Sequence, residues 1–124
     1  MSNNDSFFVN RIKSIGFAFK GAYHLIKNEA SIKVQFAIGI VMTIAGFYFQ
    51  LSTLEWIIQI LVITLIMAIE GINTAIEEIA DFMHPEFHKK IGLIKDISAG
   101  AVFIFAVGAI IIGLIIYLPK IITL

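Results

Sequence analysis

The sequence predicts an all-α integral membrane protein with an N-terminal amphipathic surface helix and three transmembrane helices in each subunit. Of its 124 residues, 59% are hydrophobic, and the mean hydropathy of +0.94 is above the range of ordinary soluble domains. Residues 34–54 and 97–118 carry no charge, and each stretch is long enough to cross about 30 Å of hydrocarbon as a helix. We expect one domain over residues 1–124.

Bulk charge and cysteine content exclude several classes of protein. Nine basic and nine acidic residues give no net charge, so neither nucleic acid nor an acidic polymer is indicated as a partner. Without cysteine, the chain has no disulfide framework, thiolate metal site or cysteine nucleophile. Residues 1–6 are polar and lack the apolar core of a cleaved signal peptide, so the membrane spans themselves are expected to direct insertion.

Residues 7–28 have the pattern of an amphipathic helix. Lysines recur every seven residues at Lys13, Lys20 and Lys27, beside an apolar stripe about 100° wide at the helical period. The pattern predicts a helix lying at the membrane interface, with ammonium groups reaching water or lipid phosphate. Packing against other helices of the same protein is an alternative, and the two are compatible. The apolar stripe consists of Phe8, Ile12, Ile15, Phe19, Ala22, Tyr23 and Ile26.

The predicted membrane spans are residues 34–54, 55–83 and 97–118. Pro85 is expected to break the second helix at His84, and Pro119 with Lys120 is expected to end the third. Basic residues gather in the N-terminal segment and in the connection between the second and third spans. Both segments should therefore face the cytoplasm.

One face of the second span concentrates polar side chains. At about 100° per residue, Glu70, Asn73, Glu77 and Asp81 share this face, whereas Glu78 falls at its edge. A helix of this length extends beyond the hydrocarbon, so the acidic end lies at the cytoplasmic water boundary. Carboxylates on a helix that has just crossed the bilayer are expensive and usually functional.

This arrangement suits a magnesium-bound nucleotide. Mg²⁺ takes one or two protein carboxylates and fills its other positions with water and phosphate oxygens, which indicates Glu29 and Glu77 as metal ligands. Lys95 could supply positive charge for phosphate. Glu70, two turns deeper, is the candidate to accept a proton from an attacking hydroxyl.

Other interpretations of these residues are structural. Glu77 or Asp81 alone could be solvated charges, and Asn73 could simply bond a neighbouring helix. His84 and His88 resemble a pair of metal ligands, but Pro85 disrupts their helical spacing and no third ligand is evident. Residues 16–21 have the glycine spacing of a P-loop without its Lys and Ser/Thr, so we reject that motif.

The combined pattern resembles the prokaryotic diacylglycerol kinase and undecaprenol kinase family over residues 11–118. The residues that carry the resemblance are Lys20-Gly21, Asn28-Glu29-Ala30, Glu70, Asn73-Thr74-Ala75-Ile76-Glu77, Asp81, His88, Gly92, Lys95-Asp96 and Ala99-Gly100-Ala101-Val102. The chain departs from the family at Lys33-Val34-Gln35 and by one position at Arg11, both associated with substrate contacts. Residues 46–49 and 54–56 are more similar to the undecaprenol branch.

The resemblance implies a homotrimeric bundle in the bacterial inner membrane, with active sites shared between neighbouring protomers on the cytoplasmic side. It implies that Glu70 is the general base and that Glu29 and Glu77 hold Mg²⁺ on ATP, supported by Asn73. The residues that it places around the nucleotide are Lys95, Asp96, His88, Gly92 and Phe17.

The expected function is ATP- and Mg²⁺-dependent phosphorylation of a membrane lipid alcohol, with undecaprenol favoured over diacylglycerol. The alternatives are a small oligomeric cation channel or transporter, whose acidic face would line a pore, and a non-catalytic assembly subunit. A channel predicts acids on every span or near the midplane, yet residues 97–118 contain none. An assembly subunit leaves the concentration of acids at one helix end unexplained.

Overall fold

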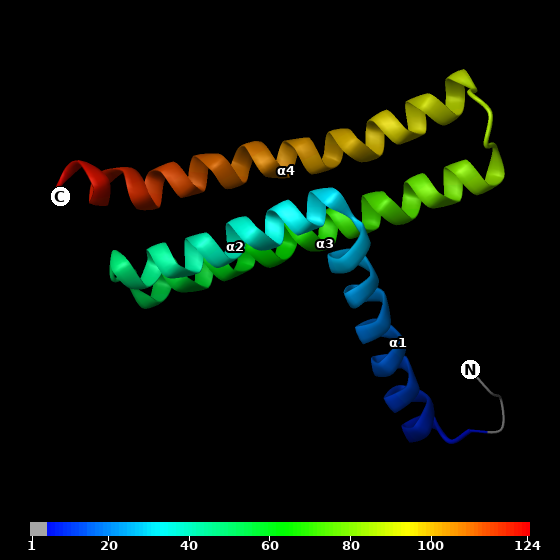
Figure 1. Cartoon of the computed structure of the whole chain (residues 1–124), viewed down its shortest axis with the longest axis horizontal. Coiled ribbons are helices and arrows are strands. Elements are labelled where there is room, and N and C mark those ends of the chain that lie inside the picture. The colour runs from blue at the N-terminus through cyan, green and yellow to red at the C-terminus, as the bar shows by residue number, and fades with distance from the viewer. Residues whose placement is uncertain (1–4) are drawn as a thin grey trace.

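The computed structural model describes residues 5–124, which form helices and no strand. In chain order the helices are α1 (Phe7–Asn28), α2 (Ala30–Tyr48), α3 (Thr53–Met83) and α4 (Lys89–Ile122). In Figure 1, α2, α3 and α4 run alongside one another while α1 points away from them. The all-helical class is confirmed, and the last three helices are candidate membrane spans because each is long and apolar enough to cross a membrane.

The joint between α1 and α2 is a single residue. Ser6 caps α1 by accepting a hydrogen bond from the Val9 N–H at 3.2 Å, and the helix ends at Asn28. Glu29 has extended backbone angles and is both the C-cap of α1 and the N-cap of α2. The chain therefore changes direction at Glu29, which is a candidate metal ligand.

The helical segment predicted over 34–54 is wrong at its C-terminal end, because α2 stops at Tyr48. Gln50 adopts a left-handed φ of 55°. The Leu51 N–H then donates to the Gly46 carbonyl at 3.1 Å and the Gln50 N–H to the Phe47 carbonyl at 3.3 Å. These two bonds form a Schellman motif, which ends a helix by satisfying its last carbonyls. The polar residues Gln50, Ser52, Thr53 and Glu55 predict a short turn here, and the structure begins that turn earlier than the absence of charge indicated.

Helix α3 begins at Thr53, slightly before the predicted start at residue 55, and ends at Met83 as predicted. Ser52 accepts from the Glu55 N–H at 3.2 Å while the Glu55 carboxylate accepts from the Ser52 N–H at 2.9 Å, a reciprocal capping box. At the other end, His84 before Pro85 is the C-cap, as expected.

Helix α4 extends beyond the uncharged segment 97–118 at both ends. It begins at Lys89, where the His88 ring caps it by accepting from the Lys90 N–H at 3.1 Å. The prediction that Pro119 and Lys120 end this helix is wrong, since it continues to Ile122. Pro119 lacks a backbone N–H but keeps its carbonyl. This carbonyl accepts from the Thr123 N–H at 3.3 Å and from the Thr123 hydroxyl at 2.9 Å, which closes the last turn of α4.

Helix α3 packs antiparallel to both α2 and α4, and several contacts define the register of each pair. Gly39 lies against Ile63, and a Cβ atom at Gly46 would come within 2.6 Å of the Trp56 ring, so close packing there requires glycine. Between α3 and α4, Glu55 pairs with Lys120, Gln59 with Tyr117 and Asp81 with Lys95. The register shows which residues of the three helices lie at the same level of the bundle.

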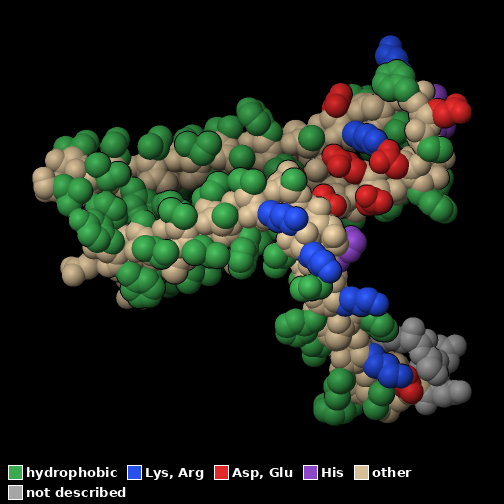
Figure 2. All heavy atoms as spheres, viewed as in Figure 1, with side chains coloured by type: hydrophobic (Ala, Val, Ile, Leu, Met, Phe, Trp, Pro, Cys, Tyr) green, Lys and Arg blue, Asp and Glu red, His purple; other side chains and the backbone are tan. Residues whose placement is uncertain are grey.

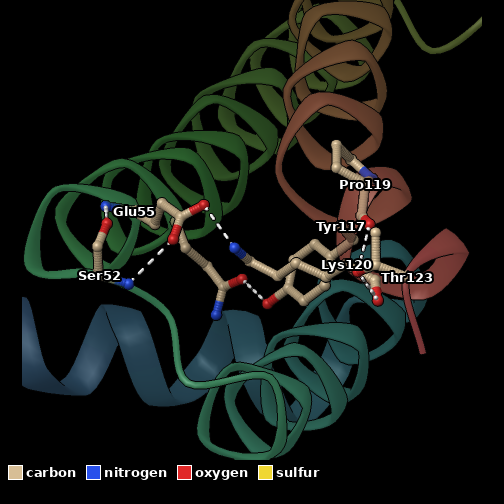
Figure 3. A network of polar contacts seen from close by, with 7 residues as sticks. Ser52, Glu55, Tyr117, Pro119, Lys120 and Thr123 are labelled. Atoms are coloured by element: carbon tan, nitrogen blue, oxygen red, sulfur yellow. Dashed lines mark hydrogen bonds and ion pairs between the residues drawn. The ribbon is translucent and has the colours of Figure 1, made fainter.

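A polar cluster, here called the outer clasp, joins α2, α3 and α4 at the end remote from the α3–α4 connection (Figure 3). The Tyr117 hydroxyl donates to Gln59 Oε1, and Gln59 Nε2 donates to the Met42 carbonyl at 3.0 Å. The Lys120 ammonium lies 3.0 Å from the Glu55 carboxylate. Hydrogen bonds between side chains of membrane helices hold the helices in one register.

Candidate functional site

The candidate site is built on the C-terminal half of α3, where Glu70, Asn73 and Glu77 share one face. Glu70 and Glu77 are half-buried, and Asn73 is only 7% exposed. Asn73 Nδ2 donates to Glu77 Oε1 at 3.4 Å, while Asn73 Oδ1 is buried without a hydrogen-bond partner among the described residues. A buried acceptor without a partner is unfavourable, so this face presents an oxygen that is available to a ligand.

Glu29 reaches the same region from the joint between α1 and α2. A Cβ atom at Gly71 would lie 2.9 Å from the Leu25 side chain, which shows that the end of α1 packs closely against α3. The register of α2 on α3, defined by Gly39 and Ile63, places Glu29 level with Asn73. The half-buried Glu29 side chain therefore belongs to the same end of the bundle as the polar face of α3.

Helix α4 contributes Lys95, which forms an ion pair with Asp81. Lys95 precedes the uncharged segment, and the hydrogen bond that its ammonium donates to the Asp81 carboxylate raises the pKa of Lys95. The charges of Asp81 and Glu77 contribute less in the same direction, and desolvation acts in the opposite direction. The ammonium thus remains charged at neutral pH beside the carboxylates. Figure 2 shows acidic side chains gathered at this end of α3 and α4, with a basic side chain among them.

Three of the predicted nucleotide-binding residues lie at the edges of this region, and a fourth, Phe17, lies away from it. His88 and Asp96 are exposed on the first turns of α4, and Gly92 lies near the Phe87 ring, which would be 3.6 Å from a Cβ there. Phe17 is 61% exposed and lies about 18 Å along α1 from the joint at Glu29. Within one chain, Phe17 therefore lies away from Glu29, Glu70 and Glu77. It lines a shallow surface depression on α1 together with Lys20, Tyr23, His24 and Lys27.

The donor set fits a magnesium ion that is shared with phosphate. No group of three or more His, Asp or Glu side chains within residues 5–124 is arranged to enclose a metal on its own. Mg²⁺ does not need such a cage, because it binds through one or two carboxylates and takes substrate phosphates and water as further ligands. Glu29, Glu77 and the unpaired amide oxygen of Asn73 are oxygen donors of the required kind.

Sequence reasoning missed one polar contact in this region and one buried amide on α2. Asp81 was predicted to lie on the polar face, but its pairing with Lys95 depends on the register of two helices. Gln35, on α2, was noted only as a departure from the family pattern, yet its Oε1 is buried and has no hydrogen-bond partner among residues 5–124. An amide in an apolar span was the available signal.

Comparison with known proteins connects this arrangement to a family. The family described as prokaryotic diacylglycerol kinase matches residues 16–117 of the chain. The undecaprenol kinase of Bacillus subtilis is 38% identical over 108 residues, which cover 87% of this chain and 88% of that protein. The diacylglycerol kinase of Escherichia coli K12 is 28% identical over 111 residues, covering 90% and 91%. That of Synechocystis is 26% identical over 116 residues, covering 93% and 66%.

Proposed function

Because this chain belongs to the prokaryotic diacylglycerol kinase family and is a lipid kinase, we propose that it transfers the γ-phosphoryl group of Mg-ATP to a membrane lipid alcohol. The observation that carries the proposal is the half-buried polar face of Glu70, Asn73 and Glu77, at the end of a span where water and lipid meet. ATP reaches this face from the cytoplasm and the alcohol reaches it from the bilayer. The proposed location is the bacterial inner membrane.

Glu70 is proposed to accept the proton of the lipid hydroxyl. As that proton moves to the Glu70 carboxylate, the hydroxyl oxygen forms a bond to the γ-phosphorus, and the bond from this phosphorus to the β–γ bridging oxygen breaks to release ADP. Glu70 is half-buried and two turns deeper than Glu77, so it lies on the lipid side of the polar face. A positioned base of this kind contributes about 10²- to 10⁴-fold to the rate.

Glu29 and Glu77 are proposed to hold Mg²⁺ on the ATP phosphates, and Asn73 to fix the Glu77 carboxylate. The bound ion would neutralise negative charge on the phosphates. Asn73 orients Glu77 through their 3.4 Å hydrogen bond, and Lys95 places a further positive charge on the same side. Orientation and charge neutralisation are what phosphoryl transfer requires of a protein.

Asp96, His88, Gly92 and Phe17 are proposed to border the nucleotide. Since α1 points away from the other helices (Figure 1), Phe17 fits this role best in a site formed with a neighbouring copy. We therefore also propose a homotrimer with shared sites. In it α1 lies at the membrane interface, where its lysines face lipid phosphate and its aromatic side chains enter the bilayer.

Undecaprenol is the favoured acceptor. The similarity to the Bacillus subtilis undecaprenol kinase, 38% against 28% for the Escherichia coli diacylglycerol kinase, supports this choice. The test is a competition assay: purified protein receives Mg-ATP labelled at the γ-phosphate together with undecaprenol and diacylglycerol at equal concentration. We expect undecaprenyl phosphate to be the main labelled product. If phosphatidic acid is the main labelled product, the choice of undecaprenol as acceptor is wrong. If neither alcohol gives a labelled lipid, the proposed function is wrong.

A further inference from the structure

One ammonium group interacts with two carboxylates at the end of α3. Lys95, in the second turn of α4, donates a hydrogen bond to the carboxylate of Asp81, in the last turn of α3. The charge of Glu77 acts on the same ammonium, but less strongly than Asp81 does. Asp81 lies about 6 Å farther along α3 than Glu77, toward the end of the helix. The lysine therefore pairs with the outer carboxylate and not with the proposed metal ligand.

Lys95 has the reach to change partners. Its ammonium carries three donors on a flexible four-carbon stem, which can cover the length of one helical turn. The Lys95 side chain is 35% exposed and that of Asp81 is 57% exposed, so neither is enclosed by other side chains. Turning the stem toward Glu77 brings the ammonium to the side where the proposed function places the phosphates. Asp81 and the phosphates are thus alternative partners for one ammonium.

The relative strength of these partners favours an exchange. An ion pair between exposed side chains is weak, because water competes for both charges and the side chains lose freedom. A phosphate group forms strong charge-assisted hydrogen bonds with an ammonium. If Lys95 kept both partners, the Asp81 carboxylate would lie against the phosphates, and like charges repel. Phosphate therefore displaces Asp81 from Lys95, at a cost small enough to be reversed.

We propose that Asp81 is a positioning residue, which holds Lys95 in an ion pair and releases it to the phosphates when Mg-ATP binds. The inference rests on the proposed function, in which Lys95 supplies positive charge to the phosphates. Asp81 then opposes nucleotide binding. Once the γ-phosphoryl group has left with the lipid, Asp81 recovers Lys95 more easily, because ADP carries less negative charge than ATP. The ion pair thus favours the release of ADP.

A fixed ion pair is the alternative. Asp81 would then hold Lys95 in the position from which it binds phosphate, or would only tie α3 to α4. We favour the exchange because the pair is exposed and the outer clasp already holds α3 and α4 in register. The two models differ in sign. The exchange predicts tighter binding of Mg-ATP when Asp81 loses its charge, whereas a fixed pair predicts weaker or unchanged binding.

Three variants separate the charge of Asp81 from its position. Asp81→Asn removes the charge and keeps the shape of the side chain, whereas Asp81→Glu keeps the charge on a longer side chain. Glu78→Gln is the matched control. Glu78 is exposed and lies three residues earlier on α3, so this variant removes one negative charge and leaves the ion pair in place. All variants are compared with the wild type as full-length protein in mixed micelles.

The first readout is the reactivity of Lys95 without nucleotide. Because the Asp81 carboxylate raises the pKa of Lys95, little of its amine is free to react with a succinimidyl ester. We expect acylation of Lys95, measured by mass spectrometry, to be about three times faster in Asp81→Asn and close to the wild-type rate in the other two variants. An unchanged rate in Asp81→Asn would overturn the inference. This readout needs no phosphoryl transfer, so it remains informative if the proposed function fails.

The second readout is the dissociation constant for Mg-ATP, measured by calorimetry at constant ionic strength without lipid alcohol. We expect Asp81→Asn to bind Mg-ATP about three to five times more tightly than the wild type, and Asp81→Glu and Glu78→Gln to bind it as the wild type does. Weaker or unchanged binding in Asp81→Asn would contradict the exchange alone. A wild-type protein that binds no Mg-ATP would overturn the proposed function, and this inference with it.

A double-mutant cycle with Lys95→Met shows whether Asp81 acts through Lys95. Lys95→Met keeps a long side chain and removes the ammonium, so it should weaken the binding of Mg-ATP. In this background, we expect Asp81→Asn to change the dissociation constant by less than about twofold. An equal gain with and without Lys95, or an equal gain in Glu78→Gln, would mean that negative charge alone repels the nucleotide. The exchange of partners would then be wrong.

Discussion

At the residue scale, Glu77 interacts with two other residues of the candidate site, Asn73 and Lys95. It accepts a hydrogen bond from Asn73, and its charge contributes to the raised pKa of Lys95. We expect Glu77→Gln to raise the KM for Mg-ATP by about 10- to 100-fold, because an amide binds Mg²⁺ more weakly than a carboxylate does. Initial rates over a range of Mg-ATP concentrations, at saturating lipid, measure this effect.

Glu78→Gln is the matched control for this prediction. Glu78 is the next residue of α3 but is exposed, so removing its charge should leave the KM for Mg-ATP close to that of the wild type. Equal increases in the two variants would indicate a general loss of negative charge. The role of Glu77 as a metal ligand would then be wrong.

At the element scale, the outer clasp fixes how α3 and α4 lie against each other. Tyr117 is 7% exposed and donates to Gln59, so Tyr117→Phe leaves a buried acceptor without this donor. We expect a loss of about 1 kcal/mol in the free energy of unfolding, the usual scale for one interhelical hydrogen bond. Unfolding by SDS in mixed micelles measures it. Activity should be retained, because the clasp lies about 16 Å along α3 from Glu70.

Tyr48→Phe provides the control for the clasp, because Tyr48 is 70% exposed at the end of α2. It should leave the unfolding free energy unchanged. A loss of equal size in the two variants would assign the effect to any tyrosine hydroxyl near this end of the bundle, and the clasp would have no special part in stability.

The same elements show what the sequence could predict. Charge-free length, the period of α1 and the break at Pro85 are local properties, and they identified the helices and the polar face of α3. The pairs Gln59 with Tyr117 and Asp81 with Lys95 depend on how two helices slide against each other. The end of α2 depends on a left-handed Gln50, where glycine is the usual signal. Local patterns could therefore predict a turn near Gln50, but they could not predict the residue at which α2 ends or the contacts between helices.

At the scale of the whole molecule, the proposed trimer predicts complementation between inactive variants. Asp96 is exposed on α4 and is free to reach the site of a neighbouring copy, whereas Glu70 is half-buried within its own bundle. Mixed trimers of Glu70→Gln and Asp96→Asn chains should contain some sites with both wild-type residues. We expect their activity to exceed the sum of the two separate variants.

Kinase assays on mixed trimers, isolated through two different affinity tags, measure this recovery. Trimers of each single variant carrying both tags serve as the baseline. If mixed trimers of confirmed composition remain at that baseline, Glu70 and Asp96 act within one chain, and the proposed sharing of these residues between protomers is wrong.

The most direct measurement is phosphoryl transfer and Mg-ATP binding on one sample of folded Glu70→Gln protein in lipid vesicles. Glu70 lies on the polar face of α3 but deeper than Glu77, so its loss should lower turnover at least about 100-fold and leave the affinity for Mg-ATP within a few-fold of the wild type. Full turnover by Glu70→Gln would contradict a site in which the acidic end of α3 activates a lipid alcohol beside ATP.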